Sequence, residues 1–213
     1  MLDYILEVVF PSVCGICGKV SKDDLCKKCE IKIEENQIKL ISQYKNKYFD
    51  ECIHMYKYEG IIREKIIEYK FQDNAYLYKT FSKIILKNKK VCGILKKYDI
   101  IIPVPIHRKR KNKRGYNQTE LIANFIGKQL NIKTCNDVLF KSKNIISQSE
   151  LNKIDRRNNV KGAFIIKNEG KVNNKKILLF DDVYTTGNTV NECSKILKEA
   201  RASRVGVLTI AKD

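Results

Sequence analysis

The sequence lacks any long hydrophobic run. None of its 213 residues fall in a stretch of about 18 consecutive apolar side chains, the length that marks a membrane-spanning helix. The first ten residues place apolar side chains at helical spacing, but Asp3 and Glu7 interrupt them. No basic residues precede them, as they would in a secretory signal peptide. We therefore expect a cytoplasmic protein without a membrane span.

The chain is also short of acidic residues. It has 24 Asp and Glu against 42 Lys and Arg, which gives a formal net charge of +18. Such an excess indicates a polyanionic partner, such as nucleic acid. The alternative is that the lysines, which are spread along the whole chain, only cover solvated faces. Charge alone does not establish DNA binding.

Four cysteines near the amino terminus are paired in sequence. Cys14-x-x-Cys17 is followed, after residues 18–25, by Cys26-x-x-Cys29. Four thiolates at this spacing can close a tetrahedron around a structural Zn²⁺ ion, and two disulfides or unused thiols are the alternatives. The other cysteines stand singly, and we interpret them as small apolar fillers: Cys52, Cys92, Cys135 and Cys193.

The stretch Ile177–Thr189 carries the clearest local pattern. Residues 177–180 are apolar and predict a buried strand, and Asp181 and Asp182 follow at its carboxyl end, where ligands of open α/β sheets bind. Thr189-x-x-Glu192 fits the capping box of a helix. The apolar residues of that helix share one face: Val190, Cys193, Ile196, Leu197 and Ala200. A second apolar strand, 205–210, completes a βαβ unit.

The polar residues of this stretch suit two parts of one ligand. The adjacent carboxylates of Asp181 and Asp182 fit the cis hydroxyls of a ribose. The loop before the helix offers hydroxyls and backbone N–H groups for a phosphate: Thr185, Thr186, Gly187, Asn188 and Thr189. We therefore predict a ribose 5-phosphate site, the alternative being a solvated strand end and an ordinary turn. A P-loop ATPase is excluded because no Gly-x-x-x-x-Gly-Lys-Ser/Thr occurs.

A second strand, within Asp99–His107, ends in two prolines and leads into a basic run. If this strand is a parallel neighbour of 177–180, the run lies at the same sheet edge as the acids. Its charge would then stabilise a pyrophosphate leaving group or hold a nucleic-acid backbone on a mobile loop. The basic residues are Arg108, Lys109, Arg110, Lys111, Lys113 and Arg114.

The region before this strand predicts structure rather than chemistry. Alternation over Asp50–Tyr58 predicts a strand with His54 in a structural position. Two helices are predicted next, around residues 61–69 and 77–85. Lys70 lies between them, flanked by aromatic residues, and we interpret it as a surface lysine that could also reach a phosphate.

Two family resemblances follow from these motifs. Residues 177–189, including Val183 and Tyr184, resemble the 5-phosphoribosyl-1-pyrophosphate (PRPP) motif of type I phosphoribosyltransferases. Nearly the whole chain resembles the ComF family, through the four-cysteine segment and these further motifs: Pro103-Val-Pro105, Arg114-Gly-Tyr-Asn-Gln118, Gln148-x-x-Leu151 and Arg156-x-x-Asn159-Val160-x-Gly162-Ala163-Phe164.

The resemblance implies an α/β fold, with a Rossmann-like parallel sheet flanked by helices and a small zinc-binding module. The module would span residues 1–35 and the phosphoribosyltransferase-like domain 36–213, with a flexible flap over about 144–161. Asp181, Asp182 and the loop would hold PRPP with Mg²⁺, and residues 105–114 would bind pyrophosphate. The candidates for catalysis would be Asp181, Asp182, Arg114 and Arg156, the last of which would also contact substrate from the flap. The remaining contact candidates are Ile106, His107, Arg108 and Gln148.

Two functions are compatible with this resemblance. In the first, the protein binds PRPP and assists the uptake or handling of single-stranded DNA in natural transformation, beside a ComF helicase subunit. In the second, it is an active phosphoribosyltransferase that transfers the 5-phosphoribosyl group to an acceptor such as a nucleobase.

Overall fold

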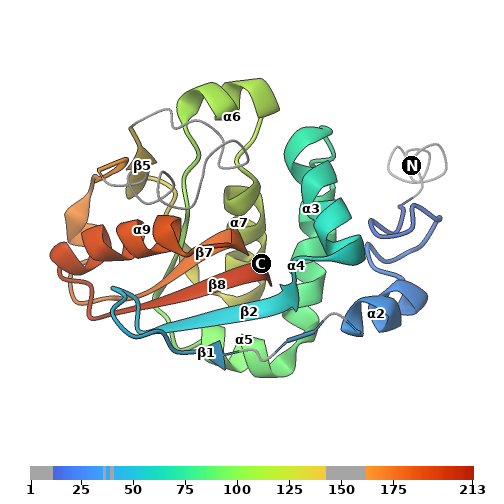
Figure 1. The fold of residues 1–213 in the computed structure, drawn as a ribbon, viewed down its shortest axis with the longest axis horizontal. Helices are drawn as coiled ribbons and strands as arrows, with labels where there is room; N and C mark the ends of the chain where they lie inside the picture. The colour runs from blue at the N-terminus through green and yellow to red at the C-terminus, as the bar shows by residue number, and fades with distance from the viewer. Residues whose placement is uncertain (1–11, 36, 39–40, 143–161) are drawn as a thin grey trace.

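The computed structural model describes residues 12–35, 37–38, 41–142 and 162–213 of the chain. Helices and strands are both found along this length (Figure 1). The elements are α2 (Lys27–Glu34), β1 (Ile41–Ser42), β2 (Glu51–Lys57), α3 (Gly60–Phe71), α4 (Leu77–Lys87), α5 (Lys89–Leu95), β3 (Ile100–Pro103), α6 (Arg108–Arg114), α7 (Gln118–Leu130), β4 (Lys133–Thr134), β5 (Leu139–Lys141), β6 (Phe164–Ile166), the 3₁₀ turn η2 (Glu169–Lys171), β7 (Lys176–Tyr184), α9 (Asn188–Glu199) and β8 (Arg204–Lys212).

A six-stranded sheet forms the centre of the fold, in the order β1-β2-β8-β7-β3-β4. Only β1 runs antiparallel to its neighbour. The unit β7-α9-β8 is the predicted βαβ unit, and β3 pairs in parallel with β7 up to Pro103 beside Phe180. The basic segment after β3 and the acids near the carboxyl end of β7 therefore lie at the same edge of the sheet, as predicted. Strands β5 and β6 form a separate antiparallel pair.

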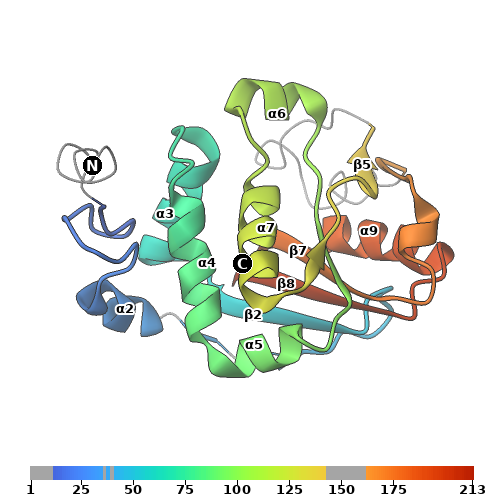
Figure 2. The ribbon, with the colours of Figure 1, turned by 180° about the vertical axis from the view of Figure 1, so that it is seen from behind.

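Two hydrophobic cores cover the two faces of the sheet. Because strand side chains alternate, Leu178 and Phe180 of β7 pack into one core, with α3, α4, α5 and α7. Ile177 and Leu179 pack into the other, with α9 and the β5-β6 pair. Figures 1 and 2 show α9 in front of one face and α7 in front of the other. The fold is thus the predicted parallel sheet flanked by helices.

Four local features differ from what the sequence predicted. The alternating strand β2 is buried on both of its faces, because Ile53 and Met55 pack into one hydrophobic core and Cys52 packs into the other. Helix α9 begins at Asn188 after a left-handed Gly187, with no side-chain cap, so the predicted capping box at Thr189 is wrong. Lys70 lies in the last turn of α3 instead of between two helices, and the basic run forms the helix α6 instead of a loop.

The cysteine-bearing segment packs against α4. Leu25 and Ile33 belong to the same core as Phe81, and the Thr80 hydroxyl donates to the carbonyl of Asp24 (2.9 Å). Lys83 adds an ion pair with Asp24 (3.0 Å). The segment is therefore held on the helical face of the domain. None of the helices in the described parts of the chain is long and apolar enough to cross a membrane.

Candidate functional site

The acid pair lies in the last part of β7. The strand continues past both acids to Tyr184, so Asp181 and Asp182 point to opposite faces of the sheet. Asp182 is buried, with 4% of its surface exposed, and Asp181 is half-buried. Each acid therefore has its own surroundings.

Protein groups bind both carboxylate oxygens of Asp182. Its Oδ1 lies 2.7 Å from the Nζ of Lys70, and its Oδ2 accepts a hydrogen bond from the Nε2 of Gln118 (2.8 Å). A buried carboxylate needs such partners, because an unpaired buried charge is strongly destabilising. Asp182 thus positions Lys70 and Gln118.

Asp181 is the more available acid. Its Oδ1 accepts the backbone N–H of Asp182 (2.9 Å), and no side chain of the described residues donates a hydrogen bond to it. Burial and the charge of Asp182 raise the pKa of Asp181 to about 7, although Lys70 and Lys141 oppose the shift. A carboxylate with this environment favours a ligand that brings hydroxyl donors or a cation.

Lys141 and Arg114 add positive charge around the acids. Burial and the nearby Arg110 lower the pKa of Lys141, which β5 carries toward Asp181. Arg114 is half-buried, and its Nη1 donates to the Oε1 of Gln118. Burial lowers the pKa of Arg114, while the charge of Asp182 acts in the opposite direction. Gln118 thus connects Arg114 to the acid pair.

The loop that follows β7 has a backbone that requires glycine. Gly187 has a φ of 73°, and a Cβ atom there would lie 2.3 Å from the hydroxyl of Tyr184. The loop leads into the amino terminus of α9, where backbone N–H groups and the helix dipole attract anions. Thr185 and Thr186 are half-buried, and the Oγ1 of Thr186 lies 3.5 Å from the backbone nitrogen of Asn188. This geometry suits a phosphate group.

Two members of the motif contribute side chains to the core rather than to a ligand. Tyr184 is buried and stacks on Tyr44 at 5.2 Å, and Val183 packs against the core on the α3 side. Tyr184 also packs against His54, whose imidazole lies 2.8 Å from the Thr209 hydroxyl. Burial and Lys212 lower the pKa of His54 to about 4, so this histidine is a neutral structural residue, as predicted.

The predicted pyrophosphate segment, residues 105–114, begins with three residues that lead into α6 and continues as that helix. Ile106 and His107 are half-buried, and Arg108 is exposed. The Nδ1 of His107 accepts the backbone N–H of Lys109 (3.2 Å), which caps the helix. Gln148, Arg156 and the predicted flap lie outside the described residues.

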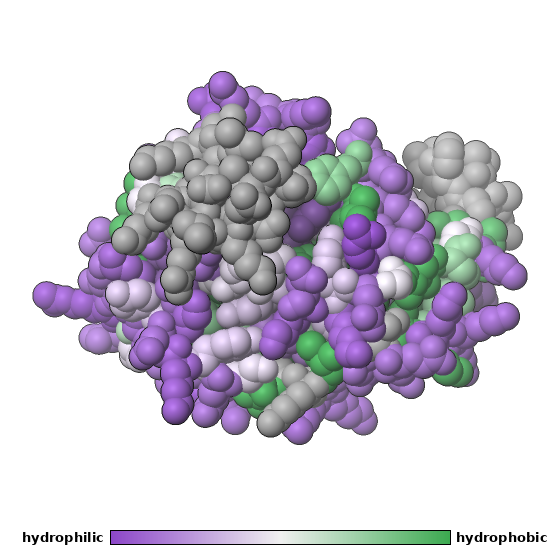
Figure 3. Space-filling model, in the orientation of Figure 1, coloured by the Kyte–Doolittle hydropathy of each residue, from purple (hydrophilic) through white to green (hydrophobic). Residues whose placement is uncertain are grey.

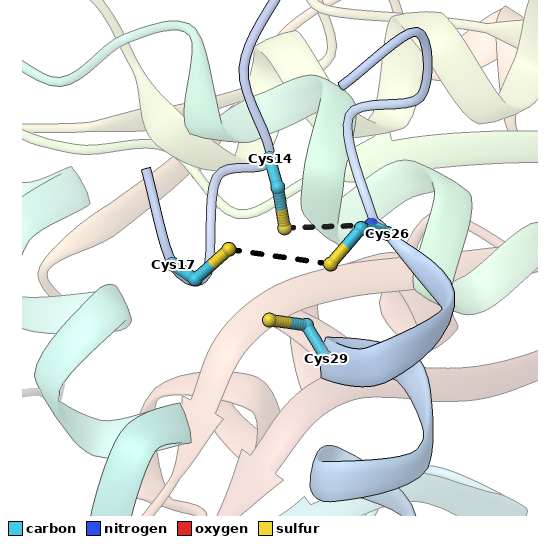
Figure 4. A group of neighbouring side chains, drawn as sticks. All are labelled: Cys14, Cys17, Cys26 and Cys29. Atoms are coloured by element: carbon cyan, nitrogen blue, oxygen red, sulfur yellow. Dashed lines mark hydrogen bonds between the residues drawn. The ribbon is translucent and has the colours of Figure 1, made fainter. Parts of the chain in front are cut away.

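The four paired cysteines converge on one point (Figure 4). Their sulfur atoms all lie within 4.8 Å of one another, and the Cys17 and Cys26 sulfurs are 4.0 Å apart. This is too long for a disulfide and close to the edge of a tetrahedral zinc–thiolate site, about 3.8 Å for Zn–S bonds of about 2.3 Å. Burial opposes ionisation of Cys14, but backbone hydrogen bonds outweigh it and lower its pKa to about 7. The cluster could hold a metal such as zinc.

Three residues of the acid site were not assigned to it from the sequence. They are Lys70, Gln118 and Lys141. Gln118 stands within the Arg-Gly-Tyr-Asn-Gln motif, which was the available signal for it. Lys70 was noted only as a surface lysine that could reach a phosphate, and Lys141 was not noted at all, so only the tertiary fold places these two lysines at the acid site.

Known proteins resemble this chain in sequence. A phosphoribosyl transferase domain is matched over residues 120–213. Competence protein F of Haemophilus influenzae is 28% identical, over 91% of this chain and 92% of its own length. Competence protein ComFC of Streptococcus pneumoniae is 30% identical, over 74% of this chain and 66% of its own. DNA utilization protein YhgH of Escherichia coli strain K12 is 23% identical, over 94% and 90%. The chain therefore belongs to the ComF family of proteins with a phosphoribosyl transferase domain.

Proposed function

We propose that this protein binds PRPP, together with Mg²⁺, at the carboxyl edge of its sheet. The observation that carries the proposal is the placement of Asp181, the loop 185–189 and the cations Lys70, Arg114 and Lys141 around one edge. Asp181 would accept hydrogen bonds from the ribose hydroxyls. The loop would bind the 5-phosphate through its backbone N–H groups.

The pyrophosphate of PRPP would lie toward the positive side chains. Residues 105–114 follow β3 at this edge, and Lys70 and Arg114 are held there by Asp182 and Gln118. Mg²⁺ keeps several waters and prefers phosphate oxygens, so the pyrophosphate would carry most of its coordination. Asp182 would act mainly by positioning these cations.

For the biological role, we propose the handling of single-stranded DNA in natural transformation. The support is the names of the relatives, which refer to competence and DNA utilization, and the net charge of +18. A cytoplasmic location and a ComF helicase partner belong to the same proposal. The second candidate is an active phosphoribosyltransferase, which the phosphoribosyl transferase match favours.

The four-cysteine cluster is part of the proposal as a structural zinc site. Four thiols would fill all four positions of a tetrahedral zinc site, which would leave no open position for catalysis. We assign the cluster to a module of residues 1–35 and the phosphoribosyltransferase-like domain to 36–213.

Thermal unfolding with and without PRPP and Mg²⁺ tests the binding proposal. Ligand at 100 times its dissociation constant stabilises the folded state by about 2.7 kcal/mol, so the melting temperature should rise. An unchanged melting temperature at millimolar PRPP would refute the site. If PRPP binds, a second assay separates the two candidate functions. Release of pyrophosphate that depends on an added acceptor would favour the enzyme, whereas PRPP that stays intact whether or not an acceptor is added would favour the DNA-handling role.

A further inference from the structure

Phe71, the last residue of α3, has an exposed aromatic ring. Its exposed fraction is 72%, although the preceding residue, Lys70, reaches inward to Asp182. A single exposed apolar residue is ordinary on a protein surface. Phe71 is unusual in its position, because it lies at the rim of the acid site and its ring contacts a charged side chain.

Arg114 packs against the ring of Phe71. The centre of its guanidinium lies 5.5 Å from the ring centroid, within the range of a cation–π contact. Arg114 is also held by its hydrogen bond to Gln118, which in turn binds Asp182. The guanidinium and the ring are therefore fixed relative to the acid site, with most of the ring open to solvent.

Helix α6 continues the positive charge away from this pair. It has no buried residue, and Figure 1 shows it projecting from the same side of the molecule as the end of α3. The top of the molecule in Figure 3, where α6 lies, is covered by hydrophilic residues. The exposed cations of the helix are Arg108, Lys109, Lys111 and Lys113, of which Lys111 pairs with Glu120.

An open aromatic ring beside a row of cations has the chemistry of a single-stranded nucleic-acid site. Bases of a single strand can stack on an aromatic face, while Lys and Arg follow the phosphates. In a duplex the bases are already stacked on one another, so the ring would find no partner. An acidic protein would use the cations but would have no specific need for the ring.

We propose that Phe71 and Arg114 form a stacking platform for one base of single-stranded DNA, whose phosphates run along α6. This inference rests on the DNA-handling part of the proposed function and adds the surface that performs it. It places the bound strand beside the edge proposed for PRPP.

The chain has no tryptophan, so Phe71→Trp creates a single fluorescent probe at the platform. Oligo(dT) should quench this fluorescence, because a base stacks on the indole. An abasic deoxyribose-phosphate chain of equal length should not quench it. Ile31→Trp, at an exposed position on α2, is the matched control and should respond to neither ligand.

Phe71→Leu tests the same contact through affinity. Leucine keeps the apolar surface but has no aromatic face, so oligo(dT) should bind roughly tenfold more weakly, as expected for the loss of one stacked base. Its affinity for the abasic chain should stay unchanged. Two results would overturn the platform alone. The first is quenching of the Phe71→Trp fluorescence by the abasic chain, or by the acidic polymer polyglutamate, equal to the quenching by oligo(dT). The second is an unchanged affinity of Phe71→Leu for oligo(dT). Absence of oligo(dT) binding by the wild-type protein would overturn the DNA-handling proposal as well.

Discussion

At the scale of single residues, Asp181 has the environment with the clearest thermodynamic consequence. Burial and Asp182 raise its pKa from 3.8 to about 7 in the folded protein. Between about pH 4 and pH 7 the folded state therefore binds more protons than the unfolded state. The free energy of unfolding of the wild type falls as the pH rises through this window, because Asp181 must then ionise in a buried site. Asp181→Asn cannot ionise, so it should exceed the wild type in free energy of unfolding by a few kcal/mol at pH 8, with little difference near pH 4.

Urea unfolding across this pH range measures the effect, and Asp50 provides a control of opposite sign. Burial raises the pKa of Asp50, but Lys198 and the backbone N–H of Val205 outweigh it and lower the pKa. Its stabilising contribution is present above the unfolded pKa and is lost as the pH falls, so Asp50→Asn should destabilise the protein at pH 7. Parallel pH profiles for wild type and Asp181→Asn would contradict the assigned environment of Asp181.

The contact between Lys70 and Asp182 makes a second prediction. Lys70→Met should destabilise the protein by roughly 3 kcal/mol, because it leaves a buried carboxylate without its cation. Adding Asp182→Asn should recover part of this loss, which a double-mutant cycle in urea measures. Lys195→Met removes an exposed ion pair on α9 and should change stability by no more than about 0.5 kcal/mol. Equal effects of the two lysine variants would show that Lys70 is only a surface residue.

The residues of the acid site differ in how well the sequence predicted them. Asp181, Asp182 and Gly187 stand in a contiguous motif, and local pattern was enough to identify them. Lys70 and Gln118 reach the same site from α3 and α7, which lie far away in sequence. Their roles depend on how helices pack on the sheet, and no local pattern encodes that packing.

At the scale of elements, α6 is where the sequence prediction and the structure differ most. Consecutive cations suggested a loop, yet Arg and Lys have good helix propensity. His107 caps the amino end, and Gly115 ends the helix with a φ of 81°. The charges are therefore arranged on a short helix, which fixes their spacing.

This arrangement predicts a defined salt dependence of DNA binding. Changing Arg108, Lys109 and Lys113 together to Gln removes three exposed charges without altering Arg114. Each lost phosphate contact should reduce the slope of log affinity against log salt by about 0.7 for single-stranded DNA. Fluorescence anisotropy of labelled oligo(dT) at several salt concentrations measures the slope. An unchanged slope would exclude α6 from the DNA surface.

The four-cysteine segment is the second element with a specific test. Cys26→Ser should lose one bound zinc per chain and lower the melting temperature, because the binding energy of a structural metal is also folding energy. Metal analysis and thermal unfolding of reduced protein measure both quantities. Cys92→Ser, outside the cluster, should keep its zinc. Equal metal content in the two variants would contradict the assignment.

At the scale of the whole molecule, the βαβ pattern of residues 177–210 and the family resemblance predicted the fold class. The βαβ unit follows from two apolar runs, residues 177–180 and 205–210, and the helical pattern between them. The parallel pairing of β3 with β7 was an assumption, which the structure bears out. The position of the cysteine segment on α4 could not be predicted, because it depends on contacts such as Thr80 with Asp24. Both proposed ligands, PRPP and DNA, are anions, which agrees with the net charge of +18.

The central claim is that the carboxyl edge of the sheet is a PRPP site. Calorimetric titration of PRPP with Mg²⁺ into the wild type, Asp181→Asn and Asp99→Asn tests it most directly. Asp99 is a suitable control because it lies at the opposite edge, where it accepts the backbone N–H of Lys176. We predict micromolar binding, equivalent to about 8 kcal/mol, for the wild type and Asp99→Asn, and a large loss for Asp181→Asn. Absence of heat at millimolar PRPP, or equal binding by all three proteins, would contradict the claim.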